Sequence, residues 1–164
     1  MSEAGDVGPA LAWIVGLLER HVIPYQVVGG LAARAYGATR PVNDVDLYVP
    51  FDLAGFAIEE IQSSIVWGPQ RHVDDHWDLT FLKANFGEQR VEIGDSSSIP
   101  RFFDAGEGRW VSQRIDYYAS VRVELFGVRV AVMPKKELVR YKLALGREVD
   151  LVDVGQISSR WGTA

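Results

Sequence analysis

The segment Asp-Val-Asp-Leu-Tyr-Val at 44–49 constrains the fold of this chain more than any other part of the sequence. Polar and apolar residues alternate in it, and successive side chains of a strand point to opposite faces of a sheet. The alternation predicts a strand with Asp44, Asp46 and Tyr48 on one face and apolar residues on a buried opposite face. Two acids on such a strand repel one another, and burial would raise their pKa values further. A bound cation would remove that cost.

Helix and strand patterns alternate along the rest of the chain. The spacing of apolar residues and the Pro and Gly boundaries predict helices over 9–22, 31–37, 52–64, 135–146 and 149–157. Runs of β-branched and aromatic residues predict strands over 25–29, 44–50, 77–86, 90–94, 121–125 and 128–133, with hairpins joining the last two pairs. Segment 95–118 has no clear period and is interpreted as a loop with a short helix or strand. This order predicts an α+β fold, a mixed sheet flanked by helices.

Length and composition fit one globular domain. We expect a single domain over 1–164, with a helical segment at 134–160. A net charge of -5 argues against a domain whose main role is to grip nucleic-acid backbone. The absence of Cys excludes a disulfide framework and thiolate zinc sites, and is compatible with a cytoplasmic protein. No apolar segment is long enough to span a bilayer, so we expect no membrane association. The sequence does not specify the oligomeric state.

The acidic pair on the predicted strand can bind a metal ion. Carboxylates at positions i and i+2 are roughly 6–7 Å apart along the backbone, and side-chain rotation can bring Asp44 and Asp46 onto one ion. Oxygen ligands suit Mg²⁺ or Mn²⁺, which recruit substrate phosphates. The alternative is a solvent-facing strand surface, because the pattern Asp-x-Asp is common.

A glycine pair precedes the acidic strand. Gly29-Gly30 ends one predicted strand and begins a helix. Such a turn brings backbone N–H groups and a positive helix end to one place, and glycine lets a phosphate approach the main chain closely. A tight strand-to-helix turn explains the two glycines equally well by itself. Together, the glycines and the acids predict a phosphate cradle that faces a metal-binding strand.

This combination resembles the signature of the nucleotidyltransferase superfamily of the polymerase-beta type. The matching residues are Gly29, Gly30, Arg40, Asp44 and Asp46. The resemblance implies that an NMP group moves from an NTP to a hydroxyl acceptor and that pyrophosphate is released. It implies nucleotide binding by Gly29, Gly30 and Arg40. It also implies a third carboxylate on a neighbouring strand, so that Asp44, Asp46 and this acid hold Mg²⁺ (or Mn²⁺). Glu92 is the expected third ligand and the catalytic carboxylate that accepts the proton of the acceptor, with Asp95 in reserve.

The resemblance extends to the C-terminal part of the chain. Residues 133–154 are similar to the tail of minimal and AbiEii-like nucleotidyltransferases, with Lys142, Arg147, Asp150 and Asp153 in the matching positions. The resemblance implies that Lys142 contacts the triphosphate and that the Asp150/Asp153 pair lies near the site or braces it. The alternative is that Lys142 is a solvated helix lysine and that Arg147 and Asp150 form a surface pair.

The sequence departs from the family pattern in two places. Val42 stands where a small hydroxyl residue is common, and the turn is Gly-Gly where Gly-Ser is common. Neither change removes a metal ligand. Segment 95–118 has no counterpart in the pattern and is expected to form an acceptor surface or a lid.

Two further clusters have simpler explanations. His72 and His76 stand four apart, but a solvated acidic loop explains them better than a zinc site. An aromatic and basic group can stack on and neutralise a nucleic-acid acceptor, although packing explains its aromatic members equally well. This group comprises Arg101, Arg109, Trp110, Arg114, Tyr117 and Tyr118.

The acceptor itself is not encoded in these motifs. A small molecule, an RNA and a protein all remain open as acceptors, and the preferred NTP is not specified. Two other functions are compatible with the same residues. One is a catalytically inactive nucleotide-binding module of the same fold, and the other is the toxin component of a toxin–antitoxin pair.

Overall fold

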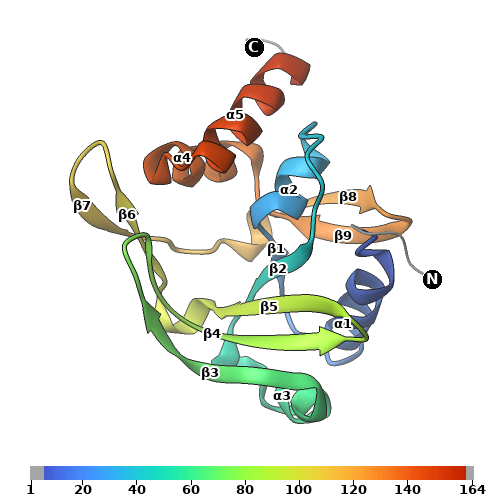
Figure 1. Cartoon of the computed structure of the whole chain (residues 1–164). Helices are drawn as coiled ribbons and strands as arrows, with labels where there is room; N and C mark the ends of the chain where they lie inside the picture. Colours follow the sequence, from blue (N-terminus) through green and yellow to red (C-terminus); the bar gives the residue numbers. More distant parts are fainter. Residues whose placement is uncertain (1–5, 162–164) are drawn as a thin grey trace.

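The structure is a computed structural model that describes residues 6–161, except for the side chains of residue 56 and of 158–161. Within this part, nine strands form one mixed sheet in the order β7-β6-β4-β5-β2-β1-β9-β8, and β3 pairs with β4 (Figure 1). Five α-helices surround the sheet. The predicted α+β architecture is therefore confirmed.

The helices and strands have the following bounds. The α-helices are α1 (Gly8–Arg20), α2 (Gly29–Ala35), α3 (Gly55–Ile61), α4 (Lys135–Leu145) and α5 (Glu148–Trp161). The first five strands are β1 (Gln26–Val27), β2 (Asp44–Val49), β3 (Ile65–Val73), β4 (Trp77–Phe86) and β5 (Gln89–Asp95). The other four are β6 (Arg101–Asp104), β7 (Arg109–Ser112), β8 (Val121–Leu125) and β9 (Val128–Val132).

The centre of the sheet combines parallel and antiparallel pairs. Strands β2 and β5 run parallel, with Asp46 opposite Glu92. Strand β1 pairs antiparallel with β2 and parallel with β9. The two predicted hairpins, β4–β5 and β8–β9, are both present. Since β2 and β5 are adjacent, acids distant in the sequence lie next to each other on one face of the sheet.

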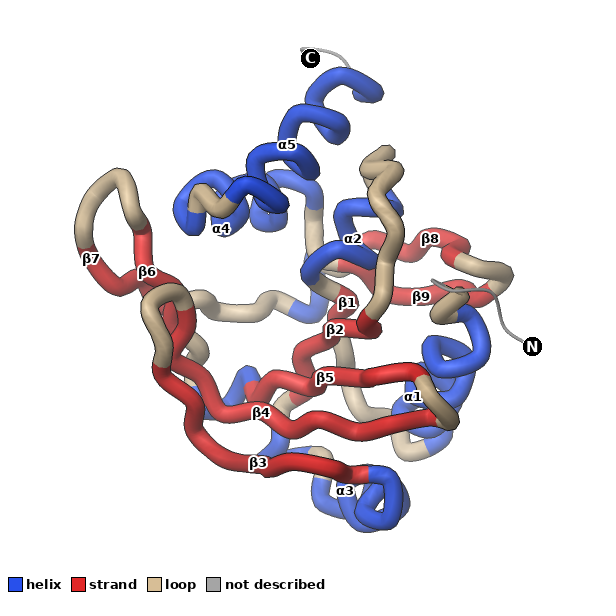
Figure 2. The backbone as a smooth tube through the Cα atoms, viewed as in Figure 1, coloured by secondary structure: helices blue, strands red, loops and turns tan. Residues whose placement is uncertain are grey.

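The helices lie at different sides of the sheet. Helix α1 packs against β4, β5 and β9, and its apolar side chains Leu11, Ile14 and Leu18 are buried. Helix α4 packs on β6 and on α5, while α5 also contacts α2. Figure 2 shows α4 and α5 together beyond α2, well away from α3. Among the described residues, none of the helices is of a length and hydrophobicity that would let it cross a membrane.

Three segments differ from the sequence-based predictions. His72 belongs to the acidic loop expected from the sequence, but 65–73 is strand β3, which pairs with β4 through irregular register. This edge strand contains Gly68-Pro69 and has mostly exposed side chains, so its sequence lacks the alternation of polar and apolar residues that predicts a strand. The helix expected at 52–64 is α3 between two short 3₁₀ turns. Segment 95–118 contains the hairpin β6–β7.

The extra hairpin is joined to the sheet by an ion-pair cluster. Strand β6 pairs with the beginning of β4, and Arg101 and Arg71 both contact the carboxylate of Asp78. Hydrogen bonds from the two guanidinium groups lower the pKa of Asp78 to about 2. Asp78 therefore stays ionised at neutral pH and anchors β3 and β6 to β4.

Candidate active site

A cavity of about 460 Å³ opens between the middle of the sheet and helices α4 and α5. Strands β2 and β5 supply acids to its wall, the turn at the start of α2 supplies glycines, and α4 supplies a lysine. All the site residues predicted from the sequence line this one cavity: Gly29, Gly30, Arg40, Asp44, Asp46, Glu92 and Lys142.

The acidic wall holds three carboxylates on two adjacent strands. Asp44 and Asp46 lie on β2, and Glu92 lies directly opposite Asp46 on β5. Burial, together with the nearby charges of Glu92 and Asp44 and a hydrogen bond with Glu92, raises the pKa of Asp46 to about 8. Without a cation, Asp46 is therefore protonated at neutral pH. The reserve acid Asp95 is engaged elsewhere, because it accepts hydrogen bonds from Ser97 and Ser98 and from the backbone N–H of Phe51.

This donor set fits a hard divalent cation in its chemistry. Carboxylate oxygens are the ligands that Mg²⁺ and Mn²⁺ take in proteins. The charges of Asp44 and Glu92 help to raise the pKa of Asp46, and a bound cation would offset the repulsion among the three carboxylates. In the part of the chain that is described, however, no three His, Asp or Glu side chains are already arranged to hold a metal ion. The role of these acids as metal ligands thus stays a prediction.

The glycine turn is held against the acidic strand by hydrogen bonds. The N–H of Val28 donates to the carbonyl oxygen of Asp46 at 2.9 Å. The N–H of Gly29 donates to the hydroxyl of Tyr141, from α4, at 2.8 Å. This N–H is already engaged, so a phosphate at the turn would have to displace the Tyr141 hydroxyl or bind to that hydroxyl itself.

Replacing Gly29 with Ala is expected to damage the site. Gly29 has φ +67°, and a Cβ there would lie 2.7 Å from Oδ2 of Asp46. The backbone conformation alone costs about 1–2 kcal/mol for a residue with a Cβ, and the contact pushes the Asp46 carboxylate aside. Gly87→Ala is the matched control, because Gly87 has φ +61° but open space around it. Chemical denaturation should show a lower free energy of unfolding in both variants because of the backbone conformation, and a further decrease in Gly29→Ala because of the contact with Asp46. Equal decreases in the two variants would contradict a role for this contact.

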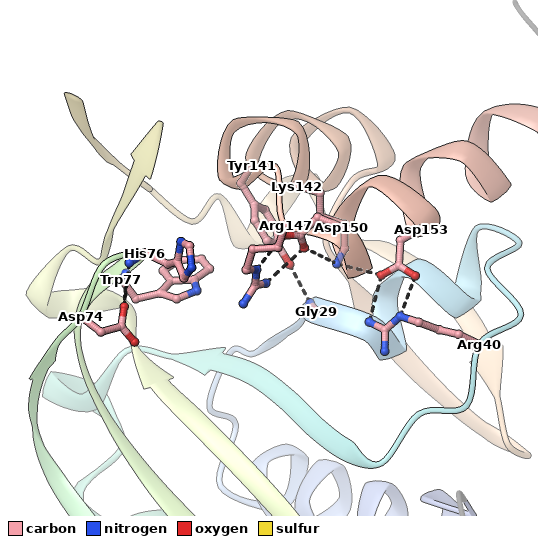
Figure 3. A network of polar contacts seen from close by, with 10 residues as sticks. All are labelled: Gly29, Arg40, Asp74, His76, Trp77, Tyr141, Lys142, Arg147, Asp150 and Asp153. Carbon is pink, nitrogen blue, oxygen red and sulfur yellow. Dashed lines mark hydrogen bonds and ion pairs between the residues drawn. The ribbon is translucent and has the colours of Figure 1, made fainter. Parts of the chain in front are cut away.

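A buried ion-pair network forms the wall opposite the acids (Figure 3). The Nζ of Lys142 lies 3.0 Å from Asp153 and 3.4 Å from Asp150. Lys142 is only 2% exposed and both aspartates are 0% exposed. The interpretations of Lys142 as a solvated lysine and of Arg147–Asp150 as a surface pair are therefore wrong. Lys142 reaches the cavity, and its contact with a triphosphate stays a prediction.

The same two aspartates bind two arginines. Arg40 donates to Asp153 from Nε at 2.7 Å and from Nη2 at 2.9 Å. Arg147 donates to Asp150 from Nε at 2.7 Å and from Nη2 at 3.1 Å. These hydrogen bonds raise the pKa values of both guanidinium groups. Helix α5 thus fixes three cations, from three separate segments, along one wall of the cavity.

Sequence reasoning missed the remaining wall, which comes from β3, β4 and the turn between them. His72, Asp74, Trp77, Leu79 and Phe81 line the cavity there. His72 and Asp74 were interpreted as parts of a solvated acidic loop. His72 instead lies on strand β3, whereas Asp74 is an exposed residue of the turn after it. Conversely, of the described residues that line this cavity, none comes from 95–118, the segment expected to form an acceptor surface or lid.

Comparisons with known proteins connect this geometry to solved structures. No protein-family model matches the chain, and no curated protein matches it by sequence. The fold does match a solved structure, a provisionally named nucleotidyltransferase (TM1012) from Thermotoga maritima. Its TM-score is 0.68 at 18% identity, over 93% of this chain and 90% of that chain. This chain has the nucleotidyltransferase fold. The lincosamide antibiotic adenylyltransferase LnuA, solved with lincomycin bound, matches with a TM-score of 0.60 at 14% identity, over 92% of this chain and 96% of LnuA.

The Gly-Gly turn of this nucleotidyltransferase fold has a local explanation. A Cβ at Gly30 would lie 2.7 Å from Nη2 of Arg40. The guanidinium that Asp153 holds in place therefore occupies the space that a side chain at position 30 would need. The departure from Gly-Ser follows from the position of Arg40, and the predicted residues of the glycine turn and of the C-terminal helices form one connected wall.

Proposed function

We propose that this chain is a metal-dependent nucleotidyltransferase that moves an NMP group from an NTP to the hydroxyl of a small acceptor. The observation that carries the proposal is the meeting of the seven predicted residues, from β2, β5, α2, α4 and the loop before β2, around one cavity. The nucleotidyltransferase fold of the two similar structures supports it. A cavity of about 460 Å³ suits small-molecule ligands.

The carboxylates would hold the divalent cation that this reaction needs. Asp44 and Asp46 would bind Mg²⁺ or Mn²⁺, and Glu92 would complete the ligand set. The bound cation supplies Lewis-acid stabilisation of charge on the phosphate oxygens. The opposite wall would bind the nucleotide, with Lys142 and Arg40 as the nearest cations and the glycine turn at the phosphates.

The reaction breaks one bond to the α-phosphorus and forms another. The acceptor oxygen attacks the α-phosphorus, the bond to the bridging oxygen of the β-phosphate breaks, and pyrophosphate leaves. Glu92 would take the hydroxyl proton of the acceptor, because it lies beside Asp46 on the side of the cavity that β4 continues. Lys142 and Arg40 would stabilise negative charge on the leaving pyrophosphate.

Transfer of labelled phosphate tests this proposal. The purified chain is incubated with Mg²⁺, each NTP labelled at the α-phosphate, and pools of hydroxyl compounds. We expect label in an acceptor product and one equivalent of pyrophosphate, both abolished by Glu92→Gln. Glu88→Gln is the matched control, because Glu88 is exposed in the turn between β4 and β5, the strand that carries Glu92. Binding of Mg²⁺-NTP without any transfer would overturn the proposal in favour of an inactive nucleotide-binding module.

The affinity for Mg²⁺ should rise with pH. Since the pKa of Asp46 is raised from 3.8 to about 8, a cation must displace a proton from this carboxyl below that pH. We expect the affinity to rise by about tenfold per pH unit below pH 8, for one released proton, and to level off above it. Calorimetry in buffers of different ionisation enthalpy measures the released proton. An affinity independent of pH between 6 and 8 would contradict the prediction.

A further inference from the structure

The end of the cavity formed by β3 and β4 is chemically different from the nucleotide wall. Its lining side chains are His72, Asp74, Trp77 and Phe81. This end lies beyond Glu92, because β4 follows β5 in the sheet and Phe81 pairs with Gly94, two residues after Glu92. An acceptor whose hydroxyl is deprotonated by Glu92 would therefore extend toward β3 and β4.

Asp74 is held in a fixed position at this end (Figure 3). Its Oδ1 accepts the backbone N–H groups of His76 and Trp77 at 2.8 and 2.7 Å. Its Oδ2 lies 3.0 Å from Nε2 of His72. The side chain is 46% exposed, so a ligand can reach the carboxylate. Partial burial opposes ionisation, but these hydrogen bonds outweigh it and lower the pKa of Asp74. A pre-positioned, ionised carboxylate thus faces the cavity.

Aromatic side chains line the same end of the cavity as Asp74. The Trp77 indole packs edge-on against the Tyr141 ring at 5.8 Å, and Phe81 packs edge-on against His72 at 5.8 Å. Ring faces attract cations, and aromatic groups beside a carboxylate are the side chains that recognise ammonium ligands.

The charges of the side chains around the cavity also favour a cationic ligand. Four carboxylates line it, and its three lysine and arginine side chains are all paired with the buried Asp150 and Asp153. Arg147 is the basic side chain across from Asp74 in Figure 3, and two of its N–H groups are directed to Asp150. The cavity wall with its supporting acids is therefore net negative. At the β3–β4 end, where the carboxylate of Asp74 lies, a cationic group of the acceptor would be attracted and an anionic group repelled.

We propose that the β3–β4 end of the cavity is the acceptor subsite and that it takes a compound with an ammonium group near its reactive hydroxyl. Asp74 binds the ammonium group, and Trp77 and Phe81 contact the apolar faces of the same molecule. This inference rests on the proposed nucleotidyl transfer for its reaction, but it predicts binding that can be measured without any turnover.

Matched ligands and matched variants test the subsite. The probes are 2-deoxystreptamine, which carries two ammonium groups, and its di-N-acetyl derivative, which has the same hydroxyls without the charges. Calorimetry is carried out on the whole chain with Mg²⁺ and a non-hydrolysable NTP analogue. We expect the diamine to bind at least about tenfold more tightly than the acetylated compound, since a charge-assisted contact is lost on acetylation. Asp74→Asn should remove this difference.

Asp75→Asn is the control variant, because Asp75 is exposed on the same turn and does not line the cavity. It should keep the preference for the diamine. Equal binding of the two probes, no binding of the diamine, or the same effect from Asp74→Asn and Asp75→Asn would overturn the subsite. Tighter binding of a single-stranded RNA oligonucleotide than of the diamine would also overturn it.

The subsite and the proposed function can fail separately. Binding of the diamine that depends on Asp74, without any labelled product, supports the subsite and counts against nucleotidyl transfer. Equal rates of transfer to both probes support the transfer and overturn the ammonium subsite. Asp74→Asn should leave the affinity for the NTP analogue unchanged, which separates a role in acceptor binding from a general loss of structure.

Discussion

Asp46→Asn is expected to abolish nucleotidyl transfer and, at the same time, to stabilise the metal-free chain. Loss of a metal-binding carboxylate removes several kcal/mol of charge stabilisation, which corresponds to a rate decrease of about a thousandfold or more. The stability effect has the opposite sign. Burial raises the pKa of Asp46 from 3.8 to about 8. The fold therefore favours the protonated Asp46 carboxyl. The stability that this carboxyl contributes is complete below about pH 3.8 and is lost as the pH rises through about 8.

Asparagine carries no charge and keeps the shape of the side chain. Above pH 8 without metal, Asp46→Asn should therefore unfold at a higher temperature than the wild type, and the difference should shrink as the pH is lowered toward 4. Added Mg²⁺ should raise the unfolding temperature of the wild type and leave that of the variant nearly unchanged. Glu88→Gln, at an exposed position, should follow the wild type in both measurements. Retained transfer activity in Asp46→Asn would contradict the role of this residue.

Asp153→Asn is expected to cause the largest loss of stability among the variants considered. The carboxylate of Asp153 pairs with Arg40 and with Lys142, and the Lys142 side chain is 2% exposed. Removing one partner of a buried ion pair costs up to about 3–5 kcal/mol, and Lys142 would keep only its longer, 3.4 Å contact with Asp150. Since Arg40 is 31% exposed, water can replace part of its lost contact, and most of the cost comes from Lys142. Urea denaturation measures the loss directly.

A second substitution separates this cause from general damage to α5. In the Asp153→Asn background, Lys142→Met removes the buried ammonium and should recover part of the lost stability. Asp150 keeps its bidentate contact with Arg147 in that double variant. Glu148→Gln, at an exposed position in the first turn of the same helix, should change stability by less than about 0.5 kcal/mol. If the double variant were less stable than Asp153→Asn, the explanation by a buried lysine that has lost its nearer carboxylate would be wrong.

The candidate site could be predicted where local sequence patterns carry the chemistry. The alternation in 44–49 predicts one face for Asp44, Asp46 and Tyr48, and all three line the cavity. The choice of Glu92 over Asp95 followed from its place between two apolar residues, and the register puts Glu92 opposite Asp46. The first inference needed only the period of a strand, whereas the second also needed the third carboxylate that the family resemblance implies. The roles of these residues in catalysis stay predictions.

The parts that escaped prediction depend on contacts between distant segments. Strand β3 contains Gly68-Pro69 and has mostly exposed side chains, so its pairing with β4 leaves no local signal. The burial of Lys142 depends on two aspartates that follow it on the next helix. The engagement of the Gly29 N–H depends on Tyr141, 112 residues away. Spacing within one segment cannot reveal such partners, because the tertiary fold alone brings them together.

The position of β3 in the sheet has a consequence for how such a site can diversify. The acids of β2 and β5 lie on interior strands with a neighbour on each side, whereas β3 pairs only with β4. Substitutions in β3 or in the turn after it therefore disturb fewer backbone pairs than substitutions beside Asp46 or Glu92. Selection for a new acceptor can therefore change residues of β3 and of the turn between β3 and β4 while the acids on β2 and β5 stay the same.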